Sequence, residues 1–184
     1  MTSTLTLNLP AVKPQDSAAF IETWFDPEDL VAVYLKRSGD HVSKEQSVYS
    51  QFISSSVLVN EMRSERGAST LYNICSDPPS DVYIGVNISD EVDPRKRATN
   101  KDIKSVLGVA ADLDVKEGGF KDTEQILDLL RSLEIWPTCV VESGSGGVHA
   151  WWRFTEPVTP EAGKELMSRW WSHLNLQASE LGAS

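Results

Sequence analysis

The sequence predicts an α/β (α+β) protein in which a mainly helical N-terminal portion precedes alternating strands and helices. Short runs rich in Val, Ile and aromatic residues recur after residue 80 between Gly, Pro and Asp, and these are typical of strands. Segments with apolar residues three and four positions apart lie between them and are typical of helices. The 184 residues, 40% hydrophobic and 24% charged, suffice for one sizeable domain or a domain with an appendage.

Residues 1–80 are expected to form an N-terminal subdomain or extension. A short amphipathic helix is predicted within 18–25, where the apolar residues recur at helical spacing: Phe20, Ile21, Trp24 and Phe25. The segment DPEDL (26–30) has the acidic cap and the proline that begin many helices. A further helix is predicted over 48–64, which makes this portion mainly helical.

Residues 81–184 are expected to form a catalytic core. Its predicted elements are a strand over 81–89, a strand over 106–114, a helix over 122–135, strands over 137–142 and 148–154, and a helix over 159–174. Thr159 and Pro160 predict the cap and the first position of the last helix. From residue 106 the order is strand, helix, strand, strand, helix, which is a split βαβ, ferredoxin-like (RRM-like) unit without its final strand.

The composition disfavours polyanion binders, structural zinc proteins and membrane proteins. The net charge of -10 disfavours a general polyanion binder, although a site needs only local positive potential. Cys75 and Cys139 form no CxxC pair and the 3 histidines form no cluster with them, which disfavours a structural zinc site. No apolar run reaches the roughly 18 residues that a membrane helix needs, so we expect a cytoplasmic protein without a membrane partner.

The apolar run that begins at Val106 ends in Asp-Leu-Asp (112–114), on a central strand. Successive strand side chains point to opposite faces, so Asp112 and Asp114 share one face. Carboxylates about 6–7 Å apart can both reach one hard cation, or hold a pair of cations. The alternative is the solvated end of a strand. The buried run before, the glycines after, and the position at the carboxyl end of the strand favour a site.

The predicted strand 148–154 carries a second candidate element. Its alternation places His149, Trp151 and Arg153 on the face away from the core. Histidine and arginine both donate to anionic oxygens and could recognise a phosphate, whereas the alternative is a surface histidine without a role. Trp151 could stack on a base or could simply pack. The glycine-rich turn 143–147 is a weak further signal for anion binding.

A basic segment, DPRKRATNK (93–101), precedes the Asp-Leu-Asp strand in this acidic chain. A solvated loop is one interpretation, and contact with the phosphates of a nucleotide or a nucleic-acid strand is the other. Its basic residues are Arg95, Lys96, Arg97 and Lys101.

The stretches VYIGVN, AADLDVKEGG and VVESGSGGVHAWWRF, with the basic segment, resemble the archaeo-eukaryotic primase superfamily. More narrowly, they resemble the bifunctional primase-polymerase domains of phage and plasmid replication proteins, over roughly residues 81–155. The resemblance implies that Asp112 and Asp114 hold Mg²⁺ or Mn²⁺ and that His149 contacts the phosphates of an incoming nucleoside triphosphate. It implies DNA-directed nucleotidyl transfer on a single-stranded DNA template and primer, in a bacterial host cell if the protein is of phage origin. The remaining candidate nucleotide-binding residues are Ser143, Ser145, Arg153 and Arg97.

The sequence also departs from that family. Gly147 stands where the family has serine, so a hydroxyl contact would come from Ser143 or Ser145. A third acidic motif is expected on a later strand, and none is found before Ser184; Glu142 could stand in for it or lie on the rim. We therefore expect a fragment that is cut inside its catalytic fold before the last strand. In such families a helicase region often follows.

Three other functions fit part of the pattern. A glycosyltransferase would use Asp112 and Asp114 to hold Mn²⁺ against a sugar nucleotide, but this leaves His149 and the basic segment unexplained. A phosphatase with an aspartyl nucleophile would need a hydroxyl or β-branched residue where Lys116 stands. A nucleic-acid-binding module without catalysis is the non-enzymatic alternative.

Overall fold

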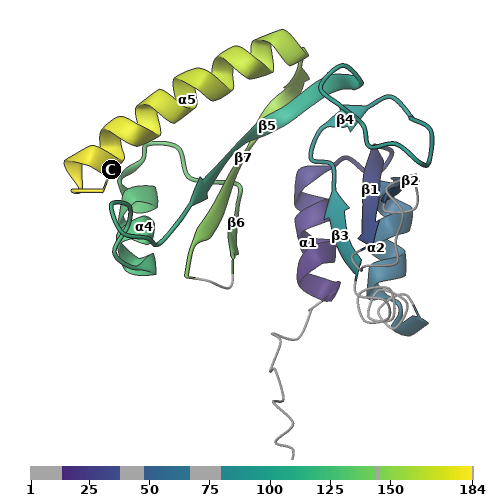
Figure 1. The fold of residues 1–184 in the computed structure, drawn as a ribbon, viewed down its shortest axis with the longest axis horizontal. Coiled ribbons are helices and arrows are strands. Elements are labelled where there is room, and N and C mark those ends of the chain that lie inside the picture. Colours follow the sequence, from purple (N-terminus) through teal and green to yellow (C-terminus); the bar gives the residue numbers. More distant parts are fainter. Residues whose placement is uncertain (1–13, 38–47, 67–79, 144–145, 184) are drawn as a thin grey trace, which may run out of the picture.

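The computed structural model describes residues 14–37, 48–66, 80–143 and 146–183 (Figure 1). They form helices and two antiparallel sheets, which confirms the α+β class. The strand orders are β2-β1-β3 and β4-β5-β7-β6. The elements are α1 (Pro14–Trp24), β1 (Leu30–Arg37), β2 (Val48–Ser54), α2 (Ser55–Arg63), β3 (Ser80–Ile84), β4 (Ile88–Ser89), β5 (Ile103–Leu113), α4 (Thr123–Ser132), β6 (Cys139–Glu142), β7 (Val148–Val158) and α5 (Pro160–Glu180).

The prediction of a mainly helical N-terminal portion is wrong. The segment 26–30 is a turn that leads into β1, and the predicted helix over 48–64 is β2 followed by α2. The turn is closed by its own hydrogen bonds, because Asp29 N–H donates to the Asp26 carbonyl (3.0 Å) and the Asp29 carboxylate accepts from Asp26 N–H (2.9 Å). The run LVAVYL that follows contains β-branched and aromatic residues, which favour a strand over a helix.

Helix α1 lies between the two sheets and packs against both of them (Figure 1). Its buried Trp24 donates from Nε1 to the Val86 carbonyl (2.7 Å). The rings of Trp24 and Phe20 each lie 5.3 Å from the ring of Trp151 on β7. Arg153 of β7 donates from Nε to the Trp24 carbonyl at the end of α1 (2.9 Å). One face of the second sheet is therefore covered by the N-terminal part of the chain.

The strand predicted over 81–89 is two strands in different sheets, β3 and β4. Between them, Gly85 N–H donates to the Ala32 carbonyl (2.7 Å), and a Cβ on Gly85 would lie 3.2 Å from the Ala32 Cβ. After this last contact with β1 the chain leaves the first sheet and crosses to the second. The expected domain boundary between residues 80 and 81 thus falls inside β3.

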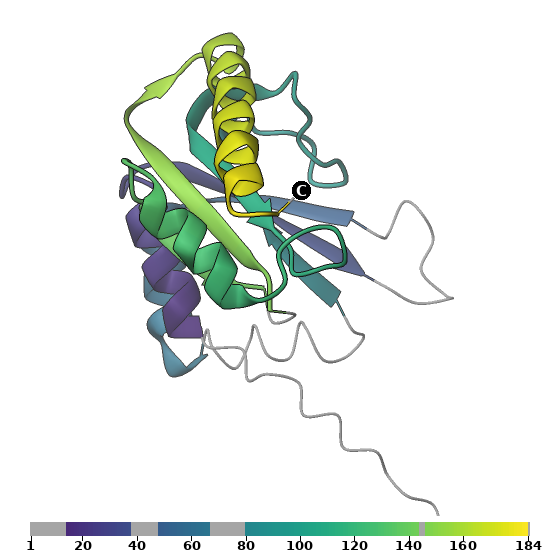
Figure 2. The same cartoon turned by 90° about the vertical axis from the view of Figure 1, so that its left-hand side faces the viewer.

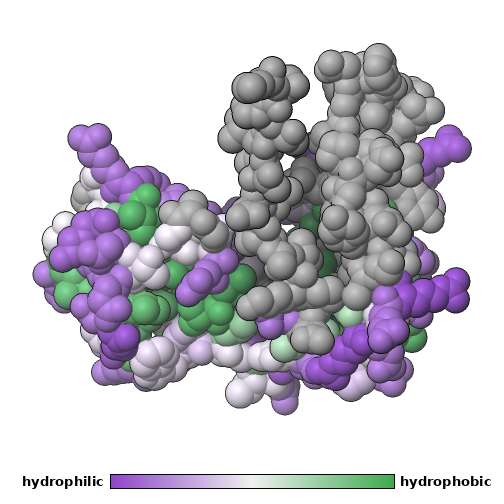
Figure 3. All heavy atoms as spheres, turned by 90° about the horizontal axis from the view of Figure 1, so that it is seen from below, coloured by the Kyte–Doolittle hydropathy of each residue, from purple (hydrophilic) through white to green (hydrophobic). Residues whose placement is uncertain are grey.

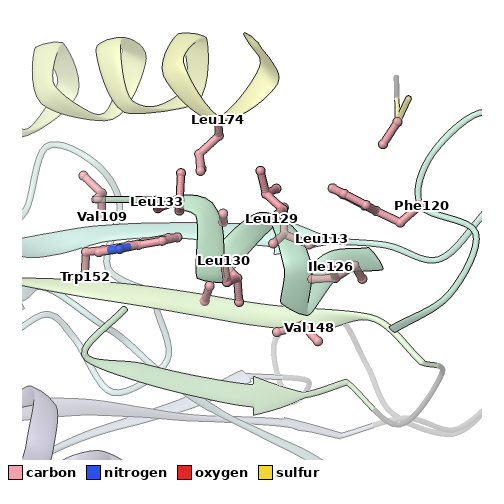
Figure 4. Close-up of a cluster of buried hydrophobic side chains, with 13 residues drawn as sticks. Val109, Leu113, Phe120, Ile126, Leu129, Leu130, Leu133, Val148, Trp152 and Leu174 are labelled. Atoms are coloured by element: carbon pink, nitrogen blue, oxygen red, sulfur yellow. The ribbon is translucent and has the colours of Figure 1, made fainter. Parts of the chain in front are cut away.

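Helices α4 and α5 cover the other face of the second sheet (Figures 1 and 2). At the start of α5, a Cβ on Gly163 would lie 2.6 Å from Val106, so the helix approaches β5 very closely. The elements predicted from residue 106 onward are all present, with shifted ends. The core between the sheet and these helices (Figure 4) includes Val109, Ala111, Leu113, Phe120, Ile126, Leu129, Leu130, Leu133, Val148, Ala150, Trp152 and Leu174.

Several large hydrophobic side chains stay exposed at β6 and just before it: Ile135, Trp136, Val140 and Val141. Among the described strands, β6 pairs only with β7 and forms an edge of the second sheet. In the coloured part of the surface in Figure 3, hydrophobic residues (green) occupy separate places between hydrophilic ones (purple). That part of the surface therefore shows no continuous apolar area.

Helix α5 begins as predicted, and the contribution of its cap residue, Thr159, to stability can be tested by substitution. The Thr159 hydroxyl accepts from Ala162 N–H (3.3 Å), and Pro160 occupies the first position. Thr159→Ala is expected to lower the free energy of unfolding by about 1 kcal/mol, which lowers the melting temperature by about 2–4 °C. Thr159→Ser keeps an acceptor and is the matched control in thermal unfolding. Equal losses for both variants would contradict the capping role.

Candidate functional site

The structure brings Asp112 and His149 into direct contact. They are register partners on the neighbouring strands β5 and β7, and His149 Nε2 lies 3.1 Å from Asp112 Oδ1. Their side chains are 64% and 41% exposed, respectively, so both are open to a ligand. Two residues that are distant in the sequence thus form one polar group at the end of the central strand.

Asp114 follows the end of β5 and pairs with a lysine. Lys116 Nζ lies 3.4 Å from Asp114 Oδ2. The chain then turns back, since Lys116 N–H donates to the Phe120 carbonyl (3.1 Å) and Gly119 N–H donates to the Lys116 carbonyl (3.0 Å). Gly118 has φ +78°, a conformation that glycine adopts without the penalty other residues incur. The glycines after the aspartates therefore form a tight turn directly beside them.

Asp112, Asp114 and Lys116 line one hollow of about 190 Å³. It lies between the end of β5, the turn that follows, and α5, which contributes Trp171 and Asn175. Its remaining lining is largely apolar and includes four residues of the core that are labelled in Figure 4: Leu113, Phe120, Leu129 and Leu174. The hollow thus has an apolar interior with the charged aspartates and lysine among its lining.

The donor set at the aspartates suits Mg²⁺ or Mn²⁺ held together with a ligand. Among residues 14–37, 48–66, 80–143 and 146–183, no group of three or more His, Cys, Asp and Glu is arranged to hold a metal. Mg²⁺ keeps several waters and typically uses one or two carboxylates plus substrate phosphates, rather than a cage of protein ligands. Asp112 and Asp114, both exposed at a strand end, match that kind of partial site.

The turn between β6 and β7 explains why glycine stands at position 147. Ser143 N–H donates to the Gly147 carbonyl (2.9 Å) and closes the turn. A Cβ on Gly147 would lie 2.9 Å from Ser143 Oγ and 3.0 Å from the Leu113 carbonyl oxygen. A serine at position 147 would crowd both, so Ser143 is the nearer source of a hydroxyl. Ser145 lies outside the described residues.

The structure does not bring Arg153 to the aspartates and the histidine. Its guanidinium pairs with Asp26 Oδ1 (2.7 Å) as well as with the end of α1, and its side chain is only 24% exposed. Trp151, on the same strand, packs against two rings of α1. The side chains of Arg153 and Trp151 both connect β7 to α1 and the turn that follows it. A role of Arg153 in nucleotide binding stays a prediction.

Arg97 also lies away from the aspartates. The basic segment is fastened to β2, because Ser50 N–H and the Ser50 hydroxyl donate to carbonyls of this segment. The guanidinium of Arg97 stacks over the Tyr34 ring, 5.5 Å from its centroid; burial raises the pKa of Tyr34, while Arg97 opposes this. The segment precedes β5, whose end is about 30 Å further along the strand. Arg97 therefore occupies a second, separate positive region.

Sequence reasoning missed Lys116, Trp171 and Asn175 as residues beside the aspartates. Lys116 had a detectable signal, because it follows Asp114 by two positions in a segment that glycines force to turn. Trp171 and Asn175 had none, because their place depends on how α5 packs on the sheet through Leu174.

Comparisons of the chain with protein-family models, with curated proteins and with solved structures find no match. No helix among the described residues has the length and apolar character needed to cross a membrane.

Proposed function

We propose that this chain is a DNA-directed primase-polymerase that makes or extends primers on single-stranded DNA by metal-dependent nucleotidyl transfer. The observation that carries the proposal is the contact between Asp112 and His149 across β5 and β7, with Asp114 directly after. In the second sheet, β7 lies between β5 and β6, and α4 connects β5 to β6. This order supports a split βαβ catalytic unit with the aspartates at the end of its central strand.

In the proposed reaction, a primer 3′-hydroxyl oxygen bonds to the α-phosphorus of a nucleoside triphosphate, the bond to pyrophosphate breaks, and the hydroxyl proton passes to water. Asp112 and Asp114 would hold Mg²⁺ or Mn²⁺, which supplies charge neutralisation and activates the attacking oxygen. His149, whose Nε2 now faces the exposed Asp112 carboxylate, would donate to a phosphate oxygen. The protein's own part is mainly positioning and charge stabilisation.

The basic segment supports a single-stranded DNA partner. Its Arg95, Lys96 and Lys101 are exposed, while carbonyl groups of the same segment are held by β2. A fixed loop with exposed cationic side chains suits contact with backbone phosphates, which supply most of the affinity for nucleic acid. We propose the same setting as the resemblance implies, phage or plasmid replication in bacterial cytoplasm.

The proposal is tested by titrating a deoxynucleoside triphosphate into the protein with and without Mn²⁺ in a calorimeter. We expect binding only with Mn²⁺, and a loss of about 10-fold or more for His149→Ala, because one charge-assisted hydrogen bond disappears. His173→Ala, another exposed histidine, which lies on α5, is the matched control and is expected to bind normally.

A sugar nucleotide titrated under the same conditions separates the polymerase from the glycosyltransferase. Tighter binding of the sugar nucleotide than of the triphosphate would favour the glycosyltransferase. Binding of single-stranded DNA without any triphosphate binding would indicate a nucleic-acid-binding module and would overturn the proposal.

A further inference from the structure

Each of the two aspartates is engaged by a basic side chain of its own. Asp112 contacts His149 Nε2 at 3.1 Å, and Asp114 contacts Lys116 Nζ at 3.4 Å. A cation that binds these carboxylates must therefore compete with a donor already present at each of them. The partner of Asp114 is an ammonium group, which carries one positive charge where a divalent cation would bring two.

The turn after β5 holds the backbone of Lys116, while its side chain lies open to solvent. Two hydrogen bonds, to Phe120 and from Gly119, hold the Lys116 backbone. A Cβ at position 119 would lie 3.0 Å from Lys116 Cγ, so glycine leaves room for the lysine stem. The Lys116 side chain is nevertheless 65% exposed. The backbone of Lys116 is therefore held in place, and its exposed side chain lines the same hollow as both aspartates.

We infer that Lys116 is a phosphate-binding residue that exchanges partners, an inference that rests on the proposed function. Without a nucleotide, its ammonium pairs with Asp114; once a divalent cation takes that carboxylate, the ammonium binds an oxygen of the triphosphate. An exposed ion pair is weak and yields readily to a divalent cation. Lysine is a compact point charge on a flexible stem, and it is a common phosphate ligand.

The exchange predicts opposite effects of one substitution on two ligands. Lys116→Ala removes a competitor of the metal, so Mn²⁺ alone is expected to bind about 2- to 3-fold tighter. The same variant loses a phosphate contact, so the triphosphate at saturating Mn²⁺ is expected to bind about 10-fold weaker. Lys116→Arg keeps the positive charge and is expected to stay close to the unaltered protein in both measurements. Free Mn²⁺ is followed by electron paramagnetic resonance, and the triphosphate by calorimetry.

A matched control is Lys104→Ala. Lys104 Nζ pairs with Asp90 Oδ1 at 2.5 Å, and its side chain is 59% exposed, but the pair lies at the start of β5. This variant is expected to change neither measurement. Thermal unfolding shows whether each variant is folded.

The outcomes separate the inference from the proposed function. If the unaltered protein binds no triphosphate with Mn²⁺, both are overturned. If it does bind, and Lys116→Ala weakens Mn²⁺ or leaves triphosphate affinity unchanged, only the exchange is overturned. Tighter Mn²⁺ together with weaker triphosphate is the result that a purely structural role of Lys116 does not produce.

Discussion

Asp112→Asn/Asp114→Asn is expected to abolish Mn²⁺-dependent triphosphate binding, with a loss of at least about 100-fold. Loss of a group that merely orients a metal ligand costs about 10–100-fold in metal affinity, and loss of both carboxylate ligands costs more. Asparagine keeps the shape of the side chain and removes its charge, so the change reports on charge and not on packing. The measurement is calorimetric titration of the triphosphate at fixed Mn²⁺ concentration.

This double variant is expected to remain folded. The pairs that it alters, Asp112 with His149 and Asp114 with Lys116, are exposed, and such pairs contribute less than about 1 kcal/mol each to stability. Removing two negative charges from a chain of net charge -10 also relieves repulsion. The melting temperature is thus expected to change by only a few degrees, roughly 2–4 °C for each kcal/mol.

Asp90→Asn/Asp93→Asn is the matched control for charge. Both residues lie in the loop before β5, where Asp90 pairs with Lys104 and the Asp93 carboxylate accepts from Arg95 N–H (2.8 Å). This control changes the net charge equally and is expected to leave triphosphate binding intact. Unchanged binding in the Asp112→Asn/Asp114→Asn protein would instead mean that the aspartates only mark the solvated end of a strand.

The second half of the fold could be predicted because each element carries its own local signals. The helix α5 has a cap and a proline at the predicted positions, and the turn that ends β5 contains the glycines that closed the predicted strand. The prediction for the N-terminal half failed because the segment DPEDL is compatible with a turn as well as with the start of a helix. What decided between them is the hydrogen bonding of Asp29 and the pairing of β1 with two neighbours, which local sequence does not encode.

The candidate site was predictable to the level of faces and strand ends. Alternation placed His149 on the face away from the predicted core, and the apolar run placed Asp112 at the end of its strand. That the two are opposite each other depends on the register between β5 and β7, and α4 and β6 separate these two strands in the chain. The same alternation placed Arg153 on the ligand face, but its partner Asp26 comes from the far end of the chain, which no local pattern reveals.

Gly108→Ala is expected to destabilise the protein more than any other substitution considered, by about 3 kcal/mol or more. A Cβ at this position would lie 2.2 Å from the Trp152 carbonyl oxygen and 2.5 Å from Cη2 of Trp24. Neither can easily move, because the first is backbone of the neighbouring strand and the second is a buried ring between the sheets. Urea unfolding measures the loss.

Gly182→Ala separates this crowding from the general effect of losing a glycine. Gly182 has φ +77°, but an added Cβ would meet nothing within 4 Å, so its substitution incurs only backbone strain, about 1–2 kcal/mol. If small shifts relieve the crowding at Gly108, the two substitutions would lower the free energy of unfolding by similar amounts. If small shifts do not relieve it, β5 and β7 must separate, and their separation would also pull Asp112 away from His149. We therefore expect Gly108→Ala to weaken triphosphate binding although Gly108 lies four residues from Asp112 and contacts no ligand, and Gly182→Ala to leave it intact.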